Sequence, residues 1–595
     1  MIHSHPFKAI QSFFLGLLAP LFYNYRFGFE DQAIQLTFAK KLTNPLLYPN
    51  DPLFDTLGDY PSFFPQIVSL IIQSEIPIAP FFFVAYMVSY GLLFLFTHQL
   101  SCLLFKNQGS NLICIFLLLI PSISLGGSSA QLSQFYPSLL ALPWIILCFN
   151  YFLKGKYVVS FIFLGLLANV HSLLAGYAFT GMTSYFIYGI IVTKRYTLKS
   201  LWLPLLFVLF ALPTIYWTLN TDNQYSELWY RLMRLRSSHH SFPFSWSINK
   251  LVLYGLFFSA FLLTLSITLD KIKDKERREK IVVFVLNIFL LFIFGTVFTE
   301  IISIPLFIKL QLFRSSIYIN ILASVFFGAL VNYNIRKEYP LSFLILLITA
   351  LFLPYNSVSY LTLFIMCAFL FFHSNFTTIF KKVQLEKGVL TSISLMLITA
   401  FLLFTSARTS WSFYADLWNE WQYLLICLIA FLLPIAILRM SRTPWVAYAF
   451  FLTMGITIPT YYYHSIYLNE QDQNDWINVQ KWVKKHTKPD QLFLTPPQKT
   501  GFRVFSERST IGEWKDGTQL YFSAEFSETW EKRMIALEVE AFDGKGYAYL
   551  LSNKLDQIAE KYKVNYVVIP TDLEIAVGQT VYSNDTYVVN YIPSL

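Results

Sequence analysis

Charged side chains are scarce in this chain: Asp, Glu, Lys and Arg make up only 13% of its 595 residues. Hydrophobic residues make up 55%, and aromatic residues alone 18%. A soluble domain carries about 25% charged residues, because a surface in contact with water requires them. The shortage of charge excludes an ordinary soluble protein and indicates one that crosses a membrane many times.

Cysteine is also rare, and its placement excludes two further classes. The five cysteines lie in or beside apolar segments, which is typical of small buried residues and does not indicate a disulfide framework or a cysteine metal site. The chain has no Gly-rich phosphate loop, no Gly-x-Ser-x-Gly elbow and no His-Glu-x-x-His zinc motif. It also lacks a basic patch interleaved with aromatic residues, so we expect no nucleic-acid partner. The cysteines are Cys102, Cys114, Cys148, Cys367 and Cys427.

Long apolar segments recur along most of the chain. A membrane-spanning helix needs about 20 apolar residues, and we predict fifteen such spans in a membrane domain over residues 1–466. Crowded pairs at 157–193 and 341–375 leave the count between 13 and 15. The predicted spans are 9–25, 80–105, 111–126, 134–153, 157–171, 173–193, 201–219, 251–269, 281–304, 315–334, 341–356, 358–375, 389–406, 421–438 and 444–466.

The composition changes after residue 466, where hydrophobic runs shorten and charges return. Residues 475–485 have the spacing of an amphipathic helix, 491–495 and 564–569 are typical of buried strands, and 581–591 predicts a hairpin. The predicted fold class is therefore a polytopic α-helical membrane protein with a C-terminal soluble α/β domain over residues 467–595.

Basic residues predict the orientation of the chain. They gather in the loops that would be cytoplasmic if the N-terminus is cytoplasmic, as the positive-inside rule requires. An odd number of spans then places the first loop, 26–79, and the C-terminal domain together on the extracytoplasmic side. We expect a multi-pass protein of the plasma (inner) membrane, with membrane lipid as its surroundings.

Two carboxylates, Glu30 and Asp31, stand where the first span meets water, and Asp51 follows in the same loop. A carboxylate inside hydrocarbon costs about 2.5 to 3.5 kcal/mol on insertion scales, so acids gathered at the end of a span are functional candidates. We predict that Asp31 and Glu30 are catalytic and that Asp51 binds substrate.

Five other outward residues are candidates for binding an anionic substrate. Arg236 with His239 and His240 could clamp a phosphate by charge-assisted hydrogen bonds, or could belong to an amphipathic helix that binds lipid headgroups. Arg314 lies at the mouth of another span, where it could bind an anion or extend to the interface. His171 lies between two spans, where it lines a cavity or bonds a neighbouring helix.

The C-terminal domain contributes a last cluster of aromatic, basic and acidic residues between 493 and 515. Arg503, Arg508 and Lys515 could recognise phosphate or carbohydrate, and the same residues could instead dock the domain onto the membrane part. Both interpretations stay open at this point.

The layout resembles the GT-C superfamily of glycosyltransferases, which includes protein O-mannosyltransferases, oligosaccharyltransferases and aminoarabinose transferases. The resemblance rests on a short first span, an acid at the start of the first outward loop, Tyr48-Pro-Asn-Asp-Pro52, many spans and an outward C-terminal domain. It implies inverting transfer of a sugar from a polyprenyl-phosphate donor to a glycan, lipid or protein acceptor. It gives the role of base to Asp31, with Glu30 as the competing residue.

A divalent metal, Mg²⁺ or Mn²⁺, is used by some members of that superfamily. The paired acids of their later loop have no clear counterpart here, so we assign no metal ligands and no certain cofactor. Two other functions stay open: a transporter or flippase of a lipid-linked or envelope precursor, and a non-catalytic envelope assembly protein. We see neither inverted repeats nor paired mid-membrane charges that would favour transport.

Overall fold

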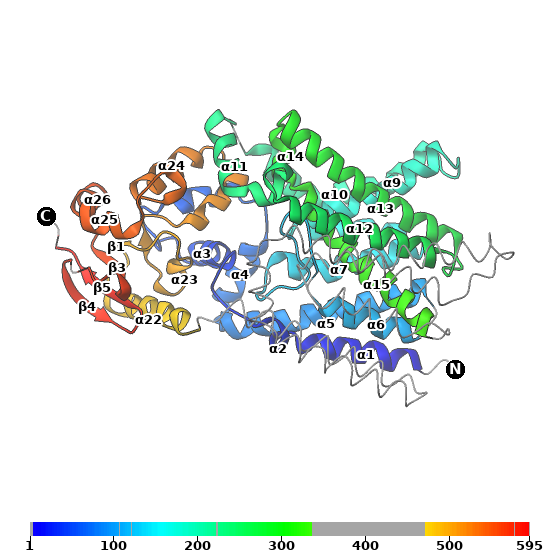
Figure 1. Ribbon diagram of the computed structural model, residues 1–595, viewed down its shortest axis with the longest axis horizontal. Helices are drawn as coiled ribbons and strands as arrows, with labels where there is room; N and C mark the ends of the chain where they lie inside the picture. Colours follow the sequence, from blue (N-terminus) through cyan, green and yellow to red (C-terminus); the bar gives the residue numbers. More distant parts are fainter. Residues whose placement is uncertain are drawn as a thin grey trace, which may run out of the picture.

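The computed structural model describes residues 4–105, 108–120, 122–221, 224–335, 470–575 and 577–593. The described chain is elongated (Figure 1). Its helical part runs along the long axis toward the N-terminus, and a smaller part that contains the only described β-sheet lies at the other end, near the C-terminus. The first loop, with α3 and α4, lies between the two.

The helical part is a bundle in which helices far apart in sequence pack side by side. Helix α1 packs along α5, α6 along α15, α8 along α10 and α9 along α13. The elements are α1 (Ser4–Leu17), α2 (Ala19–Tyr23), α5 (Ile78–Leu104), α6 (Gln108–Leu119), α7 (Pro137–Leu153), α8 (Tyr157–Ala168), α9 (Ser172–Ile191), η2 (Leu198–Leu201), α10 (Trp202–Asn220), α11 (Glu227–Ser241), η3 (Pro243–Ser245), α12 (Ile248–Leu269), α13 (Lys275–Thr296), the π-helix η4 (Val297–Ile301), α14 (Pro305–Leu310), η5 (Leu312–Ser315) and α15 (Ser316–Ile335).

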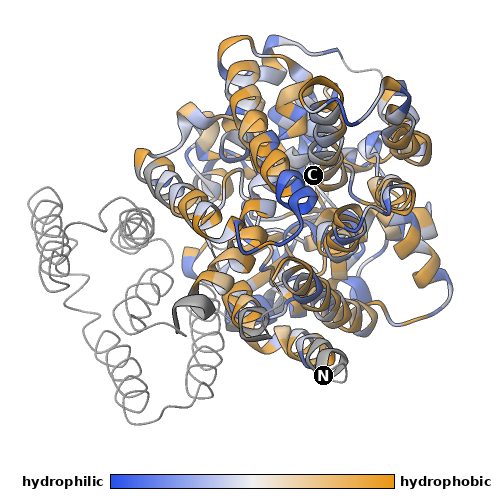
Figure 2. Cartoon of the chain, turned by 90° about the vertical axis from the view of Figure 1, so that its right-hand side faces the viewer, coloured by the Kyte–Doolittle hydropathy of each residue, from blue (hydrophilic) through white to orange (hydrophobic). Residues whose placement is uncertain are grey.

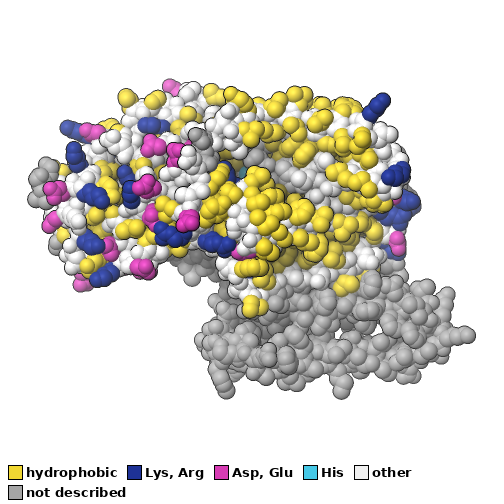
Figure 3. Space-filling view, turned by 90° about the horizontal axis from the view of Figure 1, so that it is seen from above, with side chains coloured by type: hydrophobic (Ala, Val, Ile, Leu, Met, Phe, Trp, Pro, Cys, Tyr) yellow, Lys and Arg dark blue, Asp and Glu magenta, His cyan; other side chains and the backbone are white. Residues whose placement is uncertain are grey.

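Four segments in the described residues are long and apolar enough to cross a membrane: Ile78–Leu104, Leu198–Asn220, Lys275–Ile301 and Pro305–Leu330. They coincide with predicted spans. Seen end-on, the bundle carries hydrophobic residues along its helices (Figure 2). On the face shown in Figure 3, hydrophobic side chains cover the helical part, whereas charged ones gather over the C-terminal part and at the opposite end. The chain is therefore a helical multi-pass membrane protein.

The last five predicted spans, from 341–356 to 444–466, lie outside the described residues. The span predicted at 111–126 is too long, because α6 ends at Leu119 and a loop of irregular backbone follows up to α7. The physical reason lies in the backbone of the loop: Gly126 and Gly127 both take positive φ angles, which a helix does not contain.

The first loop is folded rather than extended. It forms α3 (Gln32–Thr43), the 3₁₀ helix η1 (Pro52–Asp59) and α4 (Phe64–Gln73), and α3 packs on α4. Phe38, Tyr48 and Phe54 form its small aromatic core, in which the Tyr48 and Phe54 rings stack at 4.4 Å between centroids. This core gives the loop a defined surface on which the C-terminal domain can dock.

The C-terminal domain is built around a five-stranded mixed sheet of order β2-β1-β3-β5-β4, in which β1 pairs in parallel with β2 and β3 and the remaining pairs are antiparallel. The predicted strands and hairpin are confirmed, as is the amphipathic helix, which buries Trp476, Val479 and Val483. The elements are α22 (Glu470–His486), β1 (Leu492–Leu494), α23 (Phe502–Ser506), β2 (Ser509–Thr510), η6 (Trp514–Tyr521), α24 (Phe526–Ala536), η7 (Glu540–Phe542), α25 (Tyr547–Asn553), α26 (Leu555–Tyr562), β3 (Tyr566–Pro570), η8 (Thr571–Leu573), β4 (Gln579–Ser583) and β5 (Tyr587–Tyr591).

The C-terminal domain docks on the first loop through close backbone contact. A Cβ on Gly501 would lie 2.8 Å from the carbonyl oxygen of Gly28, and a Cβ on Gly28 would lie 2.8 Å from the Phe505 ring. Both glycines have φ angles above +80°, so a side chain at either position would meet strain as well as a clash. The Phe27 and Phe505 rings also meet edge to face at 5.9 Å.

Candidate functional site

The two acids at the start of the first loop meet a lysine of the C-terminal domain. Lys515 Nζ lies 2.7 Å from Asp31 Oδ1 and 3.3 Å from Glu30 Oε2. Lys515 belongs to η6 and is largely shielded, whereas the two carboxylates keep 52% and 62% of their side-chain surface exposed. The two carboxylates are therefore the part of this group of charges that is open to solvent.

The turn that presents the acids is held by Gln32. Its side-chain oxygen accepts the Gly28 N–H at 2.7 Å, and its amide donates to the Phe135 carbonyl at 2.9 Å. Asp31 occupies the N-cap position of α3 but makes no side-chain capping bond. An aspartate there normally accepts an N–H of the first helical turn, so this one is left available for Lys515. Glu30 has a positive φ of 49°.

The charge of Asp31 is stabilised by its neighbours. Burial alone would raise the pKa of this carboxyl, but the Lys515 ammonium, with contributions from Arg314 and His240, lowers the pKa to about 2. Many protein atoms surround this carboxylate, so burial raises its pKa although one side of the group is open to solvent. The same pairing raises the pKa of Lys515 against the effect of its own burial. Both groups are charged throughout the physiological range.

Arg314 comes from η5, at the start of α15. Its guanidinium donates to Gln311 Oε1 at 2.9 Å, and its side chain packs on the loop before α7. A Cβ on Gly126 would lie 2.9 Å from Arg314 Cγ. Gly126 and Gly127 have φ angles of 61° and 65°, and the absence of a side chain lets Gly126 approach Arg314 and Gly127 approach His240.

Three neutral histidines surround these charges. His240 Nδ1 donates to the Gly126 carbonyl at 2.6 Å, which leaves its Nε2 as an acceptor, and its ring lies 3.8 Å from that of His239. His171, the N-cap of α9, accepts the Leu174 N–H through Nδ1. Burial and the nearby arginines lower the pKa of all three histidines, to about 4 for His239 and about 3 for His171.

Arg236 adds another cation from α11. Its Nε donates to the Trp514 carbonyl at 3.2 Å, and its guanidinium lies 5.5 Å from the centre of the Trp514 ring. Burial lowers the pKa of Arg236, with Asp31 and Glu30 among the groups that oppose the shift. Arg236 is therefore near enough to the two carboxylates for their charges to act on it.

Eight of the predicted residues thus come together, and we call them the carboxylate–cation site. They come from the first loop, α11, the start of α9, η5 and η6, so elements from both ends of the chain assemble it. Paired carboxylates beside cations and unprotonated imidazoles can hold a hydroxyl, accept its proton and stabilise a phosphate. The members are Glu30, Asp31, His171, Arg236, His239, His240, Arg314 and Lys515.

The site does not fit a divalent metal. Within the part of the chain that the structure describes, no group of three or more His, Cys, Asp or Glu residues could hold one. Lys515 instead provides the positive charge between Glu30 and Asp31.

Three predicted site residues lie elsewhere. Asp51 and Arg503 are buried and pair with each other, Arg503 Nε lying 2.6 Å from Asp51 Oδ2. Arg508 donates to backbone carbonyls at 484, 487, 506 and 507. The structure engages all three in contacts within the protein, and substrate binding by them stays a prediction.

Sequence reasoning missed Tyr521 and the loop of Gly126 and Gly127. Tyr521 is buried in η6, and Arg314 and Arg236 are among the groups that act on its pKa, which burial raises. Its hydroxyl makes no hydrogen bond of normal geometry to a described residue, although Ser237 and Ser241 lie near it. Nothing marks Tyr521 in the sequence, but the Gly126-Gly127 pair signals a turn at the end of the predicted span 111–126.

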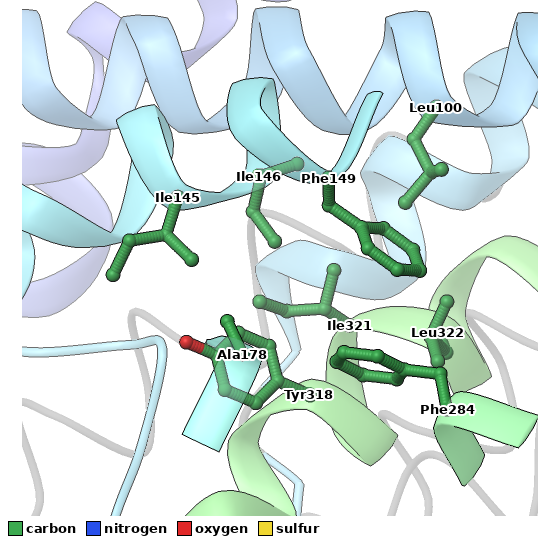
Figure 4. A pocket seen from close by; sticks show the side chains of 9 residues that line it. All are labelled: Leu100, Ile145, Ile146, Phe149, Ala178, Phe284, Tyr318, Ile321 and Leu322. Atoms are coloured by element: carbon green, nitrogen blue, oxygen red, sulfur yellow. The ribbon is translucent and has the colours of Figure 1, made fainter. Parts of the chain in front are cut away.

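A separate cavity lies inside the helical bundle (Figure 4). It has a volume of about 10 Å³ and is lined by aliphatic and aromatic side chains of α5, α7, α9, α13 and α15, including Leu100, Phe149 and Tyr318. A ligand pocket occupies about 300 to 1,000 Å³. This cavity is a packing void and not a substrate site.

Comparisons with known proteins add little. A family model described as a domain of unknown function (DUF6798) matches residues 474–537, and no curated protein matches the chain. The crystal structure of ArnT from Cupriavidus metallidurans bound to undecaprenyl phosphate is similar over 98% of this chain and 97% of that one, with 11% sequence identity and a TM-score of 0.43. A similarity this low does not assign the fold.

Proposed function

We propose that this chain is an integral-membrane glycosyltransferase of the GT-C type that moves a sugar from a polyprenyl-phosphate-linked donor to an acceptor hydroxyl. The observation that carries the proposal is the contact of Glu30 and Asp31 with Lys515 where the helical bundle joins the C-terminal domain, with the charges of Arg314 and Arg236 acting on the same carboxylates. The resemblance of the sequence to GT-C proteins implies the same chemistry at this place. The reaction side is the extracytoplasmic one, as the basic loops predict.

The geometry supports a direct displacement. The acceptor oxygen attacks the anomeric carbon, the bond from that carbon to the phosphate oxygen breaks, and polyprenyl phosphate leaves with the electron pair. Asp31, ionised at neutral pH, receives the acceptor proton. Arg314 and Arg236 stabilise the added negative charge on the phosphate, which guanidinium groups bind through paired hydrogen bonds.

The pairing with Lys515 has a chemical consequence for Asp31. A carboxylate with a pKa of about 2 is always ionised but is a weak base. When a donor phosphate approaches, the Lys515 ammonium gains a further anion to pair with besides Asp31 and Glu30, and its hold on Asp31 weakens. The base therefore becomes stronger when the donor is bound.

Purified protein in detergent, labelled polyprenyl-phosphate sugars and an acceptor mixture test the proposal. Asp31→Asn should abolish transfer without loss of folding, and Arg314→Ala should weaken binding of a polyprenyl-phosphate analogue. Matched controls are Asp55→Asn, an exposed acid of the same loop, and Arg231→Ala, an exposed arginine paired with Glu531. Full activity of Asp31→Asn would remove Asp31 from the mechanism. Analogue binding without transfer for any sugar would favour a carrier.

A further inference from the structure

A second group of charges joins the same two parts of the protein, but it is sealed from solvent. Arg503 of α23 binds Asp51 of the first loop through Nε and Nη2, at 2.6 and 3.1 Å. It binds Asp516 of η6 through Nη1 and Nη2, both at 2.9 Å. One guanidinium thus makes two paired contacts, one to each part of the molecule.

The group holds more acid than base. Glu513 Oε1 lies 3.8 Å from Arg503 Nη1, so three buried carboxylates face one guanidinium. Glu513 also accepts the N–H groups of Gly501 and Phe502. Buried ion pairs are often no more stabilising than apolar residues of the same shape, because the charges lose their hydration. This interface already has the apolar contact of Phe27 with Phe505, so adhesion alone does not require the charges.

What the buried charges provide is a fixed position for η6. Asp516 follows Lys515 directly, and its side chain accepts the Glu513 N–H at 2.8 Å in a capping box that encloses Lys515. The backbone on both sides of Lys515 is therefore bound to the group that Arg503 organises. At its far end, the Lys515 ammonium meets Asp31 and Glu30.

We propose that Arg503 is a positioning residue: by clamping Asp51 of the first loop to Asp516 of η6, it holds Lys515 in register with Asp31 and Glu30. Arg503 itself is buried and does not belong to the carboxylate–cation site. Any effect of this position of Lys515 on catalysis rests on the proposed function. The position of Lys515 itself does not. A mild change to this group, such as Asp51→Asn or Arg503→Lys, should release Lys515 while the C-terminal domain stays docked.

A neighbouring ion pair offers a matched control. Lys40 of α3 binds Glu507 at 2.8 Å and the Val504 carbonyl at 2.6 Å, so it also joins the first loop to the C-terminal domain. Lys40 and Lys515 are similarly shielded, with 17% and 13% of their side chains exposed. The Glu507 carboxylate pairs with Lys40 and Lys484, neither of which belongs to η6. Glu507→Gln therefore breaks an ion pair between the same two parts without touching the group around Arg503.

The experiment is a short pulse of an amine-acetylating reagent on the full chain in detergent, with modification of Lys515 and Lys40 measured by peptide mass spectrometry. Asp51→Asn removes one of the three acids and should raise the rate at Lys515 several-fold while leaving Lys40 unchanged. Arg503→Lys, which keeps the charge but loses the fork, should do the same. Glu507→Gln should expose Lys40 and not Lys515.

Two outcomes would overturn the proposal. Lys515 could stay protected in both Asp51→Asn and Arg503→Lys, or Lys515 and Lys40 could become reactive together, which would make the buried group a simple docking contact. Neither result depends on any sugar transfer, so the proposed function can fail separately through inactivity of the unmodified chain.

If the chain is active, the pH profile adds a second measurement. Withdrawal of Lys515 should raise the pKa of Asp31, so the acid limb of the activity profile should move to higher pH in Asp51→Asn and stay in place in Glu507→Gln. An unmoved limb in Asp51→Asn counts against the proposal. The other groups whose charges reach Asp31 are unchanged in both variants; they are Glu30, Tyr60, His171, Arg236, His240 and Arg314.

Discussion

The first loop and the C-terminal domain meet through two groups of charges that differ in their access to water. In the open group, the carboxylates of Glu30 and Asp31 keep more than half of their surface exposed. In the closed group, the exposed fraction of the side chain is 0% for Asp51, 2% for Arg503 and 4% for Asp516. The same residue types in the same interface thus take different roles: exposed charges can exchange partners with a ligand, whereas buried charges hold their geometry.

The largest effect should come from removing the cation of the closed group. Arg503→Ala leaves three buried carboxylates without their cation, and breaking a buried pair in this way costs about 3 to 5 kcal/mol. We expect the C-terminal domain to lose protection from limited proteolysis, measured on the full chain in detergent. Arg231→Ala, in an exposed pair, should leave the cleavage rate unchanged. An Arg503→Ala variant with unchanged protection would show that the three buried carboxylates tolerate the loss of their cation.

Removing the lysine of the open group should change the rate of transfer rather than the stability of the fold. Lys515→Met removes a cation from the place where phosphate charge develops, which should lower transfer about 100-fold. It should also raise the pKa of Asp31 from about 2 toward its ordinary 3.8, so activity should fall off at higher pH on the acid side. Initial rates across an acid series measure both effects. If Lys515→Met keeps its transfer rate and the acid limb of its activity profile does not move, Lys515 does not control the ionisation of Asp31.

The two groups should also respond to pH in opposite directions. Burial raises the pKa of Glu513 to about 7, above its ordinary 4.5, so the folded state binds a proton that the unfolded state releases. Stability from this group is present below pH 4.5 and is lost as the pH rises through 7. The lowered pKa of Asp31 gives the reverse: its contribution is lost as the pH falls from 3.8 through 2.

Thermal unfolding of the full chain between pH 5 and 8 checks this difference. The unmodified chain should unfold at lower temperature as the pH rises, and Glu513→Gln should flatten the slope, because glutamine cannot release the proton. An identical slope in the variant would assign the effect to another residue.

The smallest effect is expected from Glu507→Gln. The pair of Glu507 with Lys40 is partly exposed, and such pairs contribute about 1 kcal/mol or less. Lys40 keeps its bond to the Val504 carbonyl. The melting temperature should move only slightly, and a loss as large as that of Arg503→Ala would erase the distinction between the groups.

Sequence reasoning singled out the residues of the open group because the membrane restricts where charge can lie, and their function stays a prediction. Glu30, Asp31 and Arg314 were recognised at the ends of apolar segments, where polar residues are few and their position is defined. The same reasoning could not separate Arg503 from Lys515. In a soluble domain a buried charge and an exposed one look alike in sequence, since their difference depends on which surfaces meet.

The helical part was predictable to the extent that its helices are long and apolar. The segments at 80–105, 201–219, 281–304 and 315–334 agree with α5, α10, α13 and α15. The segment at 111–126 was predicted too long, because hydropathy outweighed the Pro121 and Gly126 signals. The loop that hydropathy hid is the one that packs on Arg314 and His240.

The pairing of Glu30 with Lys515 joins residues 485 positions apart. The ribosome therefore makes both acids long before their ammonium partner. During synthesis the first loop carries its acids without that partner, and a product truncated before η6 never acquires it. The site is therefore complete only after η6 has been made.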